Sequence, residues 1–380
     1  MKPKLIFFTG HYAPGFKAGG ILTNMINTLN HLSCEYDIWV VTRDRDLSDN
    51  VNYNGVETDI WQRVDNANVI YLSPKNINIT YINRLLKSYK FDVIILNGFF
   101  EIFTIFVLVC RKLFRDRAKN YVVSPFGEFA PASFNQKKLK KIIYIKVGSF
   151  LRLYENVNWK ASSTFEALDL IRELNINEKK IHLVPDLPRK NCSIPRFDLD
   201  ARTKVIFLSR IAKEKNLDYA LNILSKVKSN IIFDIYGPIE NKVYWDYCVR
   251  LFNKIPPNVK IEYKGVVNSG EILATFAKYD LFFFPTSGEA YGNVIAESLT
   301  CGTPVLLSTE TPWRNLSEDL LGWDIDLKNE ENFIDRIEYV ANLSRELKNE
   351  MKHNVLNNFK KFLNSEELVA LNIDFYNSLL

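Results

Sequence analysis

Short apolar runs recur along the chain, and each is separated from the next by a stretch in which apolar residues repeat at helical spacing. Such runs are typical of strands that are buried on both faces of a parallel sheet. In the N-terminal half they lie at Leu5–Phe8, Ile38–Val41, Val69–Leu72, Val93–Leu96, Tyr121–Ser124 and Ile181–Val184, and in the C-terminal half at Val205–Leu208, Ile231–Ile235, Val259–Tyr263, Leu281–Phe284 and Pro304–Leu307. Strands that alternate with helices predict an α/β fold in which helices cover both faces of each sheet.

The two sets of strands are separated by a segment of little periodicity, Pro185–Thr203, which also contains Pro188 and Pro195. A proline-rich, non-periodic segment is typical of a connection between domains. The sequence therefore predicts two doubly wound, Rossmann-like domains, at 1–188 and 203–364, whose strand ends face a shared cleft. Residues 365–380 have an amphipathic pattern and predict a terminal helix, for which a return to the N-terminal domain is one option.

The composition is that of a soluble globular protein, with 380 residues of which 47% are hydrophobic and 24% are charged. The five cysteines form no CxxC pair, and the four histidines show no ligand spacing. These patterns argue against a disulfide framework and a metal site, and they favour a reducing, cytoplasmic location. The chain begins with a strand pattern rather than a signal peptide, and its longest apolar run, Ile102–Cys110, is too short to span a bilayer and predicts a buried helix.

Charge is unevenly distributed, although the net charge is only +5. Residues 101–150 contain ten basic and three acidic side chains. Between 136 and 152 the basic residues alternate with apolar ones, as in helices that lie on anionic lipid. Residues 111–152 are therefore predicted to contact an anionic membrane surface, with a merely solvated helix face as the alternative. Nucleic acid is not an expected partner, because no nucleic-acid-binding motif accompanies the charge.

Residues 282–304 form the most informative stretch of the sequence. The stretch begins with the apolar run Phe282–Phe284, continues through a polar turn that contains glycine, and has helical spacing from about 291 to 301. Together with the apolar run that follows, this predicts a βαβ unit whose loop lies at the carboxyl edge of a sheet, where α/β proteins bind ligands. Two carboxylates flank that edge, Glu289 in the loop and Glu297 in the helix.

Two basic residues follow the strand predicted at Val205–Leu208. Arg210 lies just past the strand, and Lys215 lies at or near the start of the next helix, whose dipole favours anions. Together they could clamp a diphosphate, the arginine through its fork and the lysine as a point charge. A pair of solvent-facing cations is the alternative, and the presence of Glu289 and Glu297 in the same half argues against it.

A glycine pair, Gly19-Gly20, lies where a helix at about 21–32 is predicted to begin. Because glycine has no Cβ atom, the backbone there can approach a phosphate and direct its N–H groups toward it. Neither the dinucleotide-binding glycine pattern nor the Walker pattern is matched. A flexible loop with a glycine N-cap therefore remains an alternative.

Together these motifs resemble those of the large retaining glycosyltransferase family 4, whose members have the GT-B fold, and the resemblance covers nearly the whole chain. The most specific motifs are the Arg210/Lys215 pair, Phe233-Asp234-Ile235-Tyr236-Gly237, Glu289-x7-Glu297 with Tyr291-Gly292-Asn293 inside it, and Cys301-Gly302-Thr303-Pro304. Thr311-Pro312-Trp313 with Gly322-Trp323 is also similar to members that build bacterial surface polysaccharides.

The resemblance implies transfer of a sugar, with retention of configuration, from a nucleotide-diphosphate sugar, without a metal or another cofactor. Arg210 and Lys215 would neutralise the diphosphate and the leaving group, Glu289 would bind the hydroxyls of the donor sugar, and Glu297 would bind the ribose. The other implied donor contacts are Gly19, Gly20, Gly237, Gly265, Val266, Ala290, Tyr291, Gly292 and Asn293.

The resemblance is looser in the N-terminal half, where many relatives have a histidine at the end of the fourth strand, at which this chain has Leu96-Asn97-Gly98, and related chains often have a basic residue at the position of Phe126. Asn97 and Glu128 are candidate acceptor contacts, with the capping of a local backbone turn as the alternative. The implied acceptor is a glycan, lipid-linked at the inner membrane face, in surface polysaccharide biosynthesis. Another GT-B activity on nucleotide sugars, such as an epimerase or a synthase with a soluble acceptor, and a non-catalytic binding module are the alternatives.

Overall fold

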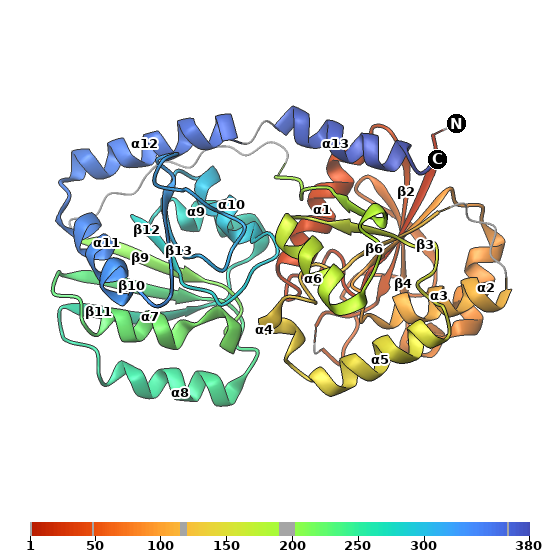
Figure 1. Ribbon diagram of the computed structural model, residues 1–380, viewed down its shortest axis with the longest axis horizontal. Helices are drawn as coiled ribbons and strands as arrows, with labels where there is room; N and C mark the ends of the chain where they lie inside the picture. The colour runs from red at the N-terminus through yellow and green to blue at the C-terminus, as the bar shows by residue number, and fades with distance from the viewer. Residues whose placement is uncertain (1, 48, 115–119, 190–201, 363–364) are drawn as a thin grey trace. The chain divides into compact units, whose positions relative to one another are not determined.

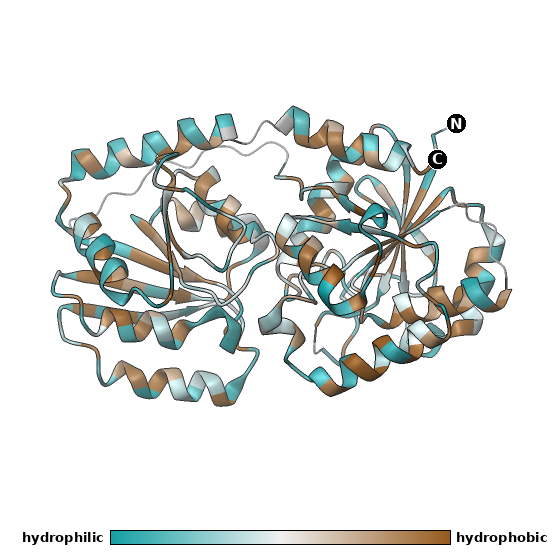
Figure 2. Ribbon diagram, in the orientation of Figure 1, coloured by the Kyte–Doolittle hydropathy of each residue, from teal (hydrophilic) through white to brown (hydrophobic). Residues whose placement is uncertain are grey.

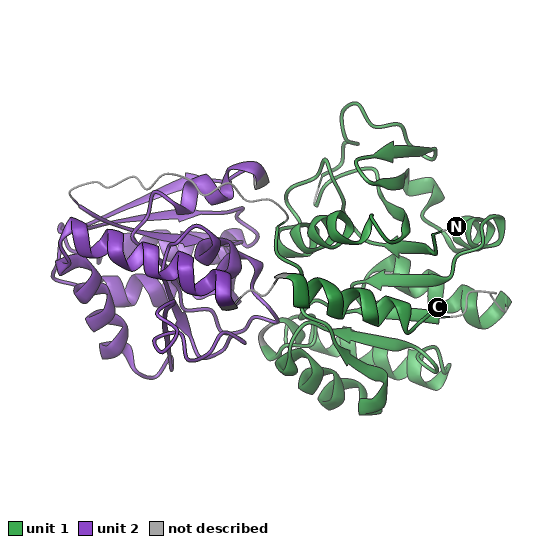
Figure 3. Ribbon diagram, turned by 90° about the horizontal axis from the view of Figure 1, so that it is seen from above, with its two compact units in different colours: residues 1–190, 365–380 green, residues 191–364 purple. Residues whose placement is uncertain are grey.

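The computed structural model describes residues 2–47, 49–114, 120–189, 202–362 and 365–380. The chain divides into two compact units, residues 1–190 with 365–380 (unit 1) and residues 191–364 (unit 2), as Figure 3 shows. Each unit contains one sheet with helices packed around it (Figure 1). The predicted α/β fold with two Rossmann-like domains is confirmed. The boundary lies within the predicted connection, of which residues 190–201, including Pro195, are outside the described part of the chain.

Unit 1 is built on an eight-stranded sheet in the order β3-β4-β2-β1-β5-β6-β7-β8. All neighbouring strands are parallel except β3 and β4, which are antiparallel. The elements are β1 (Lys4–Phe8), α1 (Gly20–Leu32), β2 (Asp37–Arg43), β3 (Trp61–Val64), β4 (Ala67–Leu72), α2 (Ile79–Ser88), β5 (Val93–Asn97), α3 (Ile102–Phe114), β6 (Asn120–Ser124), α4 (Pro131–Phe134), α5 (Lys138–Phe150), β7 (Asn158–Ala161), α6 (Thr164–Leu174), β8 (Ile181–Leu183) and α13 (Ser365–Asn377).

Alternate residues of the central strand β1 enter two different cores of unit 1. Leu5 and Phe7 belong to one buried cluster, and Ile6 and Phe8 belong to the other. This alternation follows from the two-residue period of a strand, and it explains why a strand buried on both faces appears in the sequence as a continuous apolar run. Figure 2 shows the strands as largely hydrophobic in both units.

Unit 2 is built on a six-stranded parallel sheet in the order β11-β10-β9-β12-β13-β14. One cluster of buried residues forms its core. The elements are β9 (Thr203–Leu208), α7 (Leu217–Leu224), β10 (Ile231–Tyr236), α8 (Lys242–Phe252), β11 (Val259–Gly265), α9 (Ile272–Phe276), β12 (Leu281–Phe284), α10 (Asn293–Thr300), β13 (Val305–Ser308), β14 (Gly322–Ile325), α11 (Glu330–Asn342) and α12 (Arg345–Phe362).

The three strands that the sequence pattern did not predict are β3, β7 and β14. Strand β7 is fully buried, but it contains Lys160, whose side chain is only 4% exposed and lies 3.7 Å from the carboxylate of Asp186. The lysine interrupts the apolar run in the sequence. It can be buried only because a distant carboxylate balances its charge, and sequence periodicity cannot show that partner. Strands β3 and β14 lie at sheet edges and are only half-buried, so their apolar signal is weak.

Helix α13 belongs to unit 1 although it follows unit 2 in the chain. Tyr376 packs against Phe7 and Tyr36, with ring centroids 6.3 and 6.1 Å apart. The hydroxyl of Tyr36 donates to the side-chain oxygen of Asn377 at 2.8 Å. The terminal helix therefore completes one core of unit 1. It also contacts the start of the connection to unit 2, because the Asn372 amide donates to the carbonyl of Pro185 at 3.0 Å.

Candidate functional site

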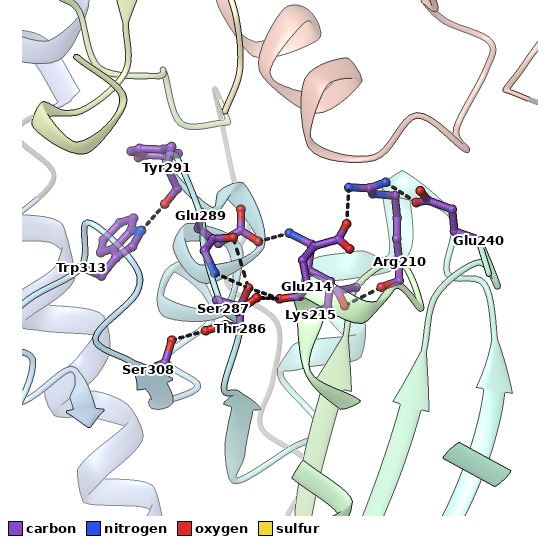
Figure 4. Close-up of polar contacts among 12 residues, drawn as sticks. Arg210, Glu214, Lys215, Glu240, Thr286, Ser287, Glu289, Tyr291, Ser308 and Trp313 are labelled. Carbon is purple, nitrogen blue, oxygen red and sulfur yellow. Dashed lines mark hydrogen bonds and ion pairs between the residues drawn. The ribbon is translucent and has the colours of Figure 1, made fainter. Parts of the chain in front are cut away.

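Strands β9 and β12 are neighbours at the centre of the sheet of unit 2, and the chain moves outward from them in opposite directions. The loops that leave their carboxyl ends therefore separate, which creates the kind of crevice in which open α/β sheets bind ligands. Figure 4 shows that the side chains of Arg210, Lys215 and Glu289 gather at this edge. The sheet order thus brings together residues that the sequence analysis had assigned to one site from two separate loops.

The two loops are fastened to each other through the backbone carbonyl of Glu214. This oxygen accepts hydrogen bonds from the backbone N–H of Ser287 at 2.8 Å, from the Ser287 hydroxyl at 2.9 Å and from the Thr286 hydroxyl at 3.0 Å. The amide of Asn216 also donates to the carbonyl of Pro285 at 3.0 Å. Sequence reasoning missed these five residues, although a small polar pair shortly after a buried strand was the signal available for Thr286 and Ser287.

Lys215 lies in a single 3-10 turn, Lys213–Lys215, that precedes α7, rather than in the helix itself. Its ammonium group forms an ion pair with the carboxylate of Glu289, and both side chains are largely buried. It also lies 5.8 Å above the ring of Phe284, the last residue of β12. The catalytic candidates Lys215 and Glu289 are therefore in direct contact across the two loops.

Arg210 lies at the more exposed side of the same edge. Its guanidinium forms an ion pair with Glu240, which comes from the loop after β10, and lies 3.7 Å from the carboxylate of Glu214. The Arg210 side chain is 36% exposed and that of Glu240 is 39% exposed, so water can reach both groups. The arginine can therefore exchange its carboxylate partner for another anion without a change in the core.

Of the two glycines predicted to lie beside the nucleotide base, Gly237 adjoins the backbone of Ser209 and Arg210. Gly237 has a φ of 131°, and a Cβ atom there would lie 1.7 Å from the carbonyl oxygen of Ser209, so only glycine fits. Its N–H donates to the carbonyl of Gly265 on the neighbouring strand at 2.8 Å. Val266, which follows, is 46% exposed. The loops after β9, β10 and β11 are thus held in contact at one end of the crevice.

The loop after β12 ends at Gly292, which caps α10 in the left-handed conformation with a φ of 83°. The helix begins at Asn293, two residues later than predicted, because Gly292 does not have helical geometry. The loop is also fixed from its other side, since the indole N–H of Trp313 donates to the carbonyl of Tyr291 at 2.5 Å, and the two rings pack with centroids 5.5 Å apart. Trp313 therefore sets the position of the segment that leads into the helix N-terminus.

Glu297 lies one helical turn beyond Asn293 in α10 and is 8% exposed. It comes from the interior of the helix, whereas Glu289 comes from the loop, so the two carboxylates have different neighbours despite their shared motif. Among the described residues, no group of three or more His, Cys, Asp or Glu side chains is placed to hold a metal ion.

The candidates in unit 1 lie on its own sheet edge and at the start of α1. Gly19 is the N-cap of α1 with a φ of 61°, and Gly20 is the first helical residue. The amide of Asn97 lies 3.0 Å from the sulfur of Met25. The carboxylate of Glu128 accepts hydrogen bonds from the backbone N–H groups of Phe99 at 2.5 Å and Phe100 at 3.2 Å, and burial raises its pKa to about 7. Glu128 thus caps a backbone turn, and acceptor contact by either residue remains a prediction.

Comparison with known proteins yields a family match that includes this edge. Residues 196–358, which include β9 to β14 and both charged loops, match the family model described as glycosyl transferases group 1. The match ends before α13 and leaves unit 1 uncovered, so the family signal comes from the unit that holds the Arg210, Lys215 and Glu289 site.

Among curated proteins, the chain is 26% identical over 234 residues to an uncharacterized 41.2 kDa protein in the cps region of Klebsiella pneumoniae. The match covers 59% of this chain and 62% of the relative, so the chain spans less than two thirds of that protein's length.

Two solved structures resemble the chain over nearly its full length. Sucrose-phosphate synthase from Thermosynechococcus elongatus has a TM-score of 0.75 at 13% identity and covers 100% of this chain and 99% of its own. The Anabaena protein HepE, in complex with UDP and glucose, has a TM-score of 0.69 at 13% identity and covers 99% of each chain. At this identity the likeness shows the fold, which is that of GT-B glycosyltransferases.

Proposed function

We propose that the enzyme transfers a hexose-type sugar from a nucleotide-diphosphate sugar to a glycan acceptor, with retention of anomeric configuration, as in glycosyltransferase family 4. The observation that supports this most directly is the gathering of Arg210, Lys215 and Glu289 at the switch point of the sheet of unit 2. Two cations and a carboxylate at one sheet edge suit a ligand that carries both a diphosphate and a sugar.

The diphosphate takes the place of Glu240 on the guanidinium of Arg210, which can bind it through two parallel N–H groups. Lys215 supplies a second positive charge. The backbone N–H groups at the N-terminus of α10, near Ala290, Tyr291, Gly292 and Asn293, donate to the phosphate and the sugar. These groups are held in place before the donor binds, so they stabilise the charge that develops as the nucleoside diphosphate leaves. Catalysis then depends on positioning and electrostatics, and the departing phosphate takes the proton of the acceptor hydroxyl.

Glu289 binds the hydroxyls of the donor sugar, and Glu297 binds the ribose. Because Glu289 is paired with Lys215, the same lysine orients the sugar-binding carboxylate and neutralises the phosphate. Gly237, Gly265 and Val266 lie beside the base. No metal ion is required, because Arg210 and Lys215 supply the positive charge that a divalent cation would otherwise provide.

The acceptor is a lipid-linked glycan, and the enzyme works in surface polysaccharide biosynthesis at the inner face of the membrane. The Klebsiella relative supports the polysaccharide context of this proposal, because it comes from a polysaccharide (cps) region. The Anabaena neighbour supports the donor class, since its structure contains UDP and glucose. Asn97 and Glu128 are the proposed acceptor contacts in unit 1.

The proposed donor class is tested by thermal unfolding with UDP-, GDP-, ADP- and dTDP-sugars in the presence of EDTA. A donor at a hundredfold excess over its Kd stabilises the folded protein by about 2.7 kcal/mol. This corresponds to an increase in Tm of about 5 °C. One nucleotide class should give this shift and the others should not. Absence of any shift contradicts the donor site, and rapid turnover without a lipid acceptor favours a synthase with a soluble acceptor.

Glu240→Gln is expected to lower the KM for the donor by about two- to fivefold with little change in kcat, because the diphosphate no longer competes with a carboxylate for Arg210. Glu330→Gln is the matched control, since Glu330 pairs with Lys226 at a similar exposure, 38% against 39% for Glu240, but outside the site. Steady-state kinetics with varied donor measures both variants. An unchanged or higher KM in Glu240→Gln shows that Glu240 does not compete with the donor.

A further inference from the structure

Helix α5 carries a row of apolar side chains that the protein does not cover. Leu139, Ile143, Val147, Phe150 and the following Leu151, here called the α5 stripe, have exposed fractions of 72, 54, 52, 86 and 48%. At about 100° per residue, these positions fall within about one third of the circumference of the helix. Figure 2 shows the hydrophobic residues along α5.

The opposite side of the helix is fixed to unit 1. Ile145 and Gly148 are the buried residues of α5, and Ile145 belongs to one core of the unit. A Cβ atom on Gly148 would lie 1.9 Å from the hydroxyl oxygen of Tyr154, so the backbone is in close contact there. The helix therefore cannot rotate to bury the α5 stripe without the loss of this packing.

The exposed charges on α5 itself are all positive, namely Lys138, Lys140 and Lys146. Arg152 follows the helix with 72% of its side chain exposed, and its guanidinium lies 3.6 Å from the carboxylate of Glu155. There is no acidic residue from position 129 to position 154. An exposed apolar row on a helix whose exposed charges are lysines is the pattern of helices that lie in the interface of an anionic membrane.

The structure also narrows the basic surface that the sequence placed at 111–152. The guanidinium of Arg111 donates to the carbonyl of Glu155 at 2.5 Å and lies 4.8 Å from the ring of Tyr121, and Lys112 lies 3.9 Å from the Glu155 carboxylate. Lys141 points inward, where its ammonium donates to the carbonyl of Ser133 at 2.9 Å. These charges are occupied within the protein, and residues 115–119 lie outside the described part of the chain.

We propose that the α5 stripe inserts into the headgroup region of an anionic lipid bilayer while the lysines beside it contact lipid phosphates. The protein is thus held at the membrane by apolar insertion as well as by charge. Among the described residues, no helix is both long and apolar enough to cross a membrane. The proposal extends the proposed function, because it assigns the surface through which the enzyme reaches a lipid-linked acceptor. Its test does not use the donor, so the two can fail separately.

The test is co-sedimentation of the full-length protein with vesicles. Wild type should bind vesicles of phosphatidylglycerol and phosphatidylcholine and should not bind pure phosphatidylcholine. The variant Leu139→Ser/Ile143→Ser/Phe150→Ser should bind at least about tenfold more weakly, and the remaining binding should disappear at high salt. The variant Lys140→Glu/Lys146→Glu should lose at least about tenfold as well. All of these positions are exposed, so the fold should persist.

Matched controls lie in unit 2. Val243→Ser removes an apolar side chain that is 79% exposed on α8, and Lys254→Glu/Lys278→Glu makes the same change in net charge at exposed positions. Both should bind vesicles as wild type does. In Phe150→Trp, brominated lipids should quench the added fluorescence, which reports insertion directly. Wild-type binding by the serine variant, equal binding to neutral vesicles, or a dimer in solution that the serine variant abolishes would overturn the proposal.

Discussion

Replacement of Lys215 by methionine is expected to lower kcat by about 10²- to 10³-fold, because one fixed charge that stabilises the departing diphosphate is lost. Lys215 is 9% exposed and lies against Phe284, so methionine fills a similar space and the fold should remain intact. Transfer or hydrolysis of the donor measures the change. Lys213→Met is the control, since Lys213 is exposed in the same turn and has no proposed role.

The pairing of Lys215 with Glu289 allows a sharper form of this experiment. If Lys215 acts only by orienting Glu289, then Glu289→Gln should lower kcat as much as Lys215→Met, and the double variant should be no worse than either. If Lys215 also neutralises the phosphate, the double variant should be clearly slower than Glu289→Gln. Turnover close to wild type in Lys215→Met would remove the lysine from the catalytic assignment.

Gly237→Ala is expected to destabilise unit 2 by about 3 kcal/mol or more, and to lower Tm by about 6 °C or more. The added Cβ would meet the backbone carbonyl of Ser209 at 1.7 Å, and relief of that clash must displace the segment that carries Arg210. Donor affinity should therefore fall together with stability. Thermal unfolding and donor binding measure the two effects.

Gly265→Ala is the matched control for this prediction. Gly265 also has a positive φ, 81°, and hydrogen-bonds Gly237, but nothing lies within 4 Å of a Cβ atom built there. The alanine should cost only about 1–2 kcal/mol, which is the strain of the left-handed conformation. Equal destabilisation by the two substitutions would contradict the close approach of Gly237 to Ser209.

The fold class could be predicted from the sequence because most strands are buried on both faces. Strand β12 is an unbroken run of buried residues, and the turn and helix that follow mark a βαβ unit without any knowledge of distant contacts. Strand β7 could not be predicted in this way, since Lys160 is tolerated there only through its pairing with Asp186. Helix α5 was predicted as a basic amphipathic surface helix, but which face it exposes was not predictable.

The candidate site was predictable as a set of residue types and was not predictable as an arrangement. Arg210, Lys215, Glu289 and Glu297 stand out in the sequence because each follows a buried strand or lies within the helix behind one. Only the tertiary structure shows the contacts among them. Lys215 pairs with Glu289, Glu240 pairs with Arg210, and the carbonyl of Glu214 joins the two loops.

By itself, the sequence determined the α/β class, the two Rossmann-like domains and a candidate set of site residues, because burial and helical or strand periodicity are recorded locally along the chain. The tertiary structure decided the strand order, the ion pairs between loops, the position of α13 and the outward orientation of the α5 stripe. Those features depend on contacts between residues far apart in sequence, and local patterns carry no information about which distant partner satisfies a buried charge or covers an apolar face.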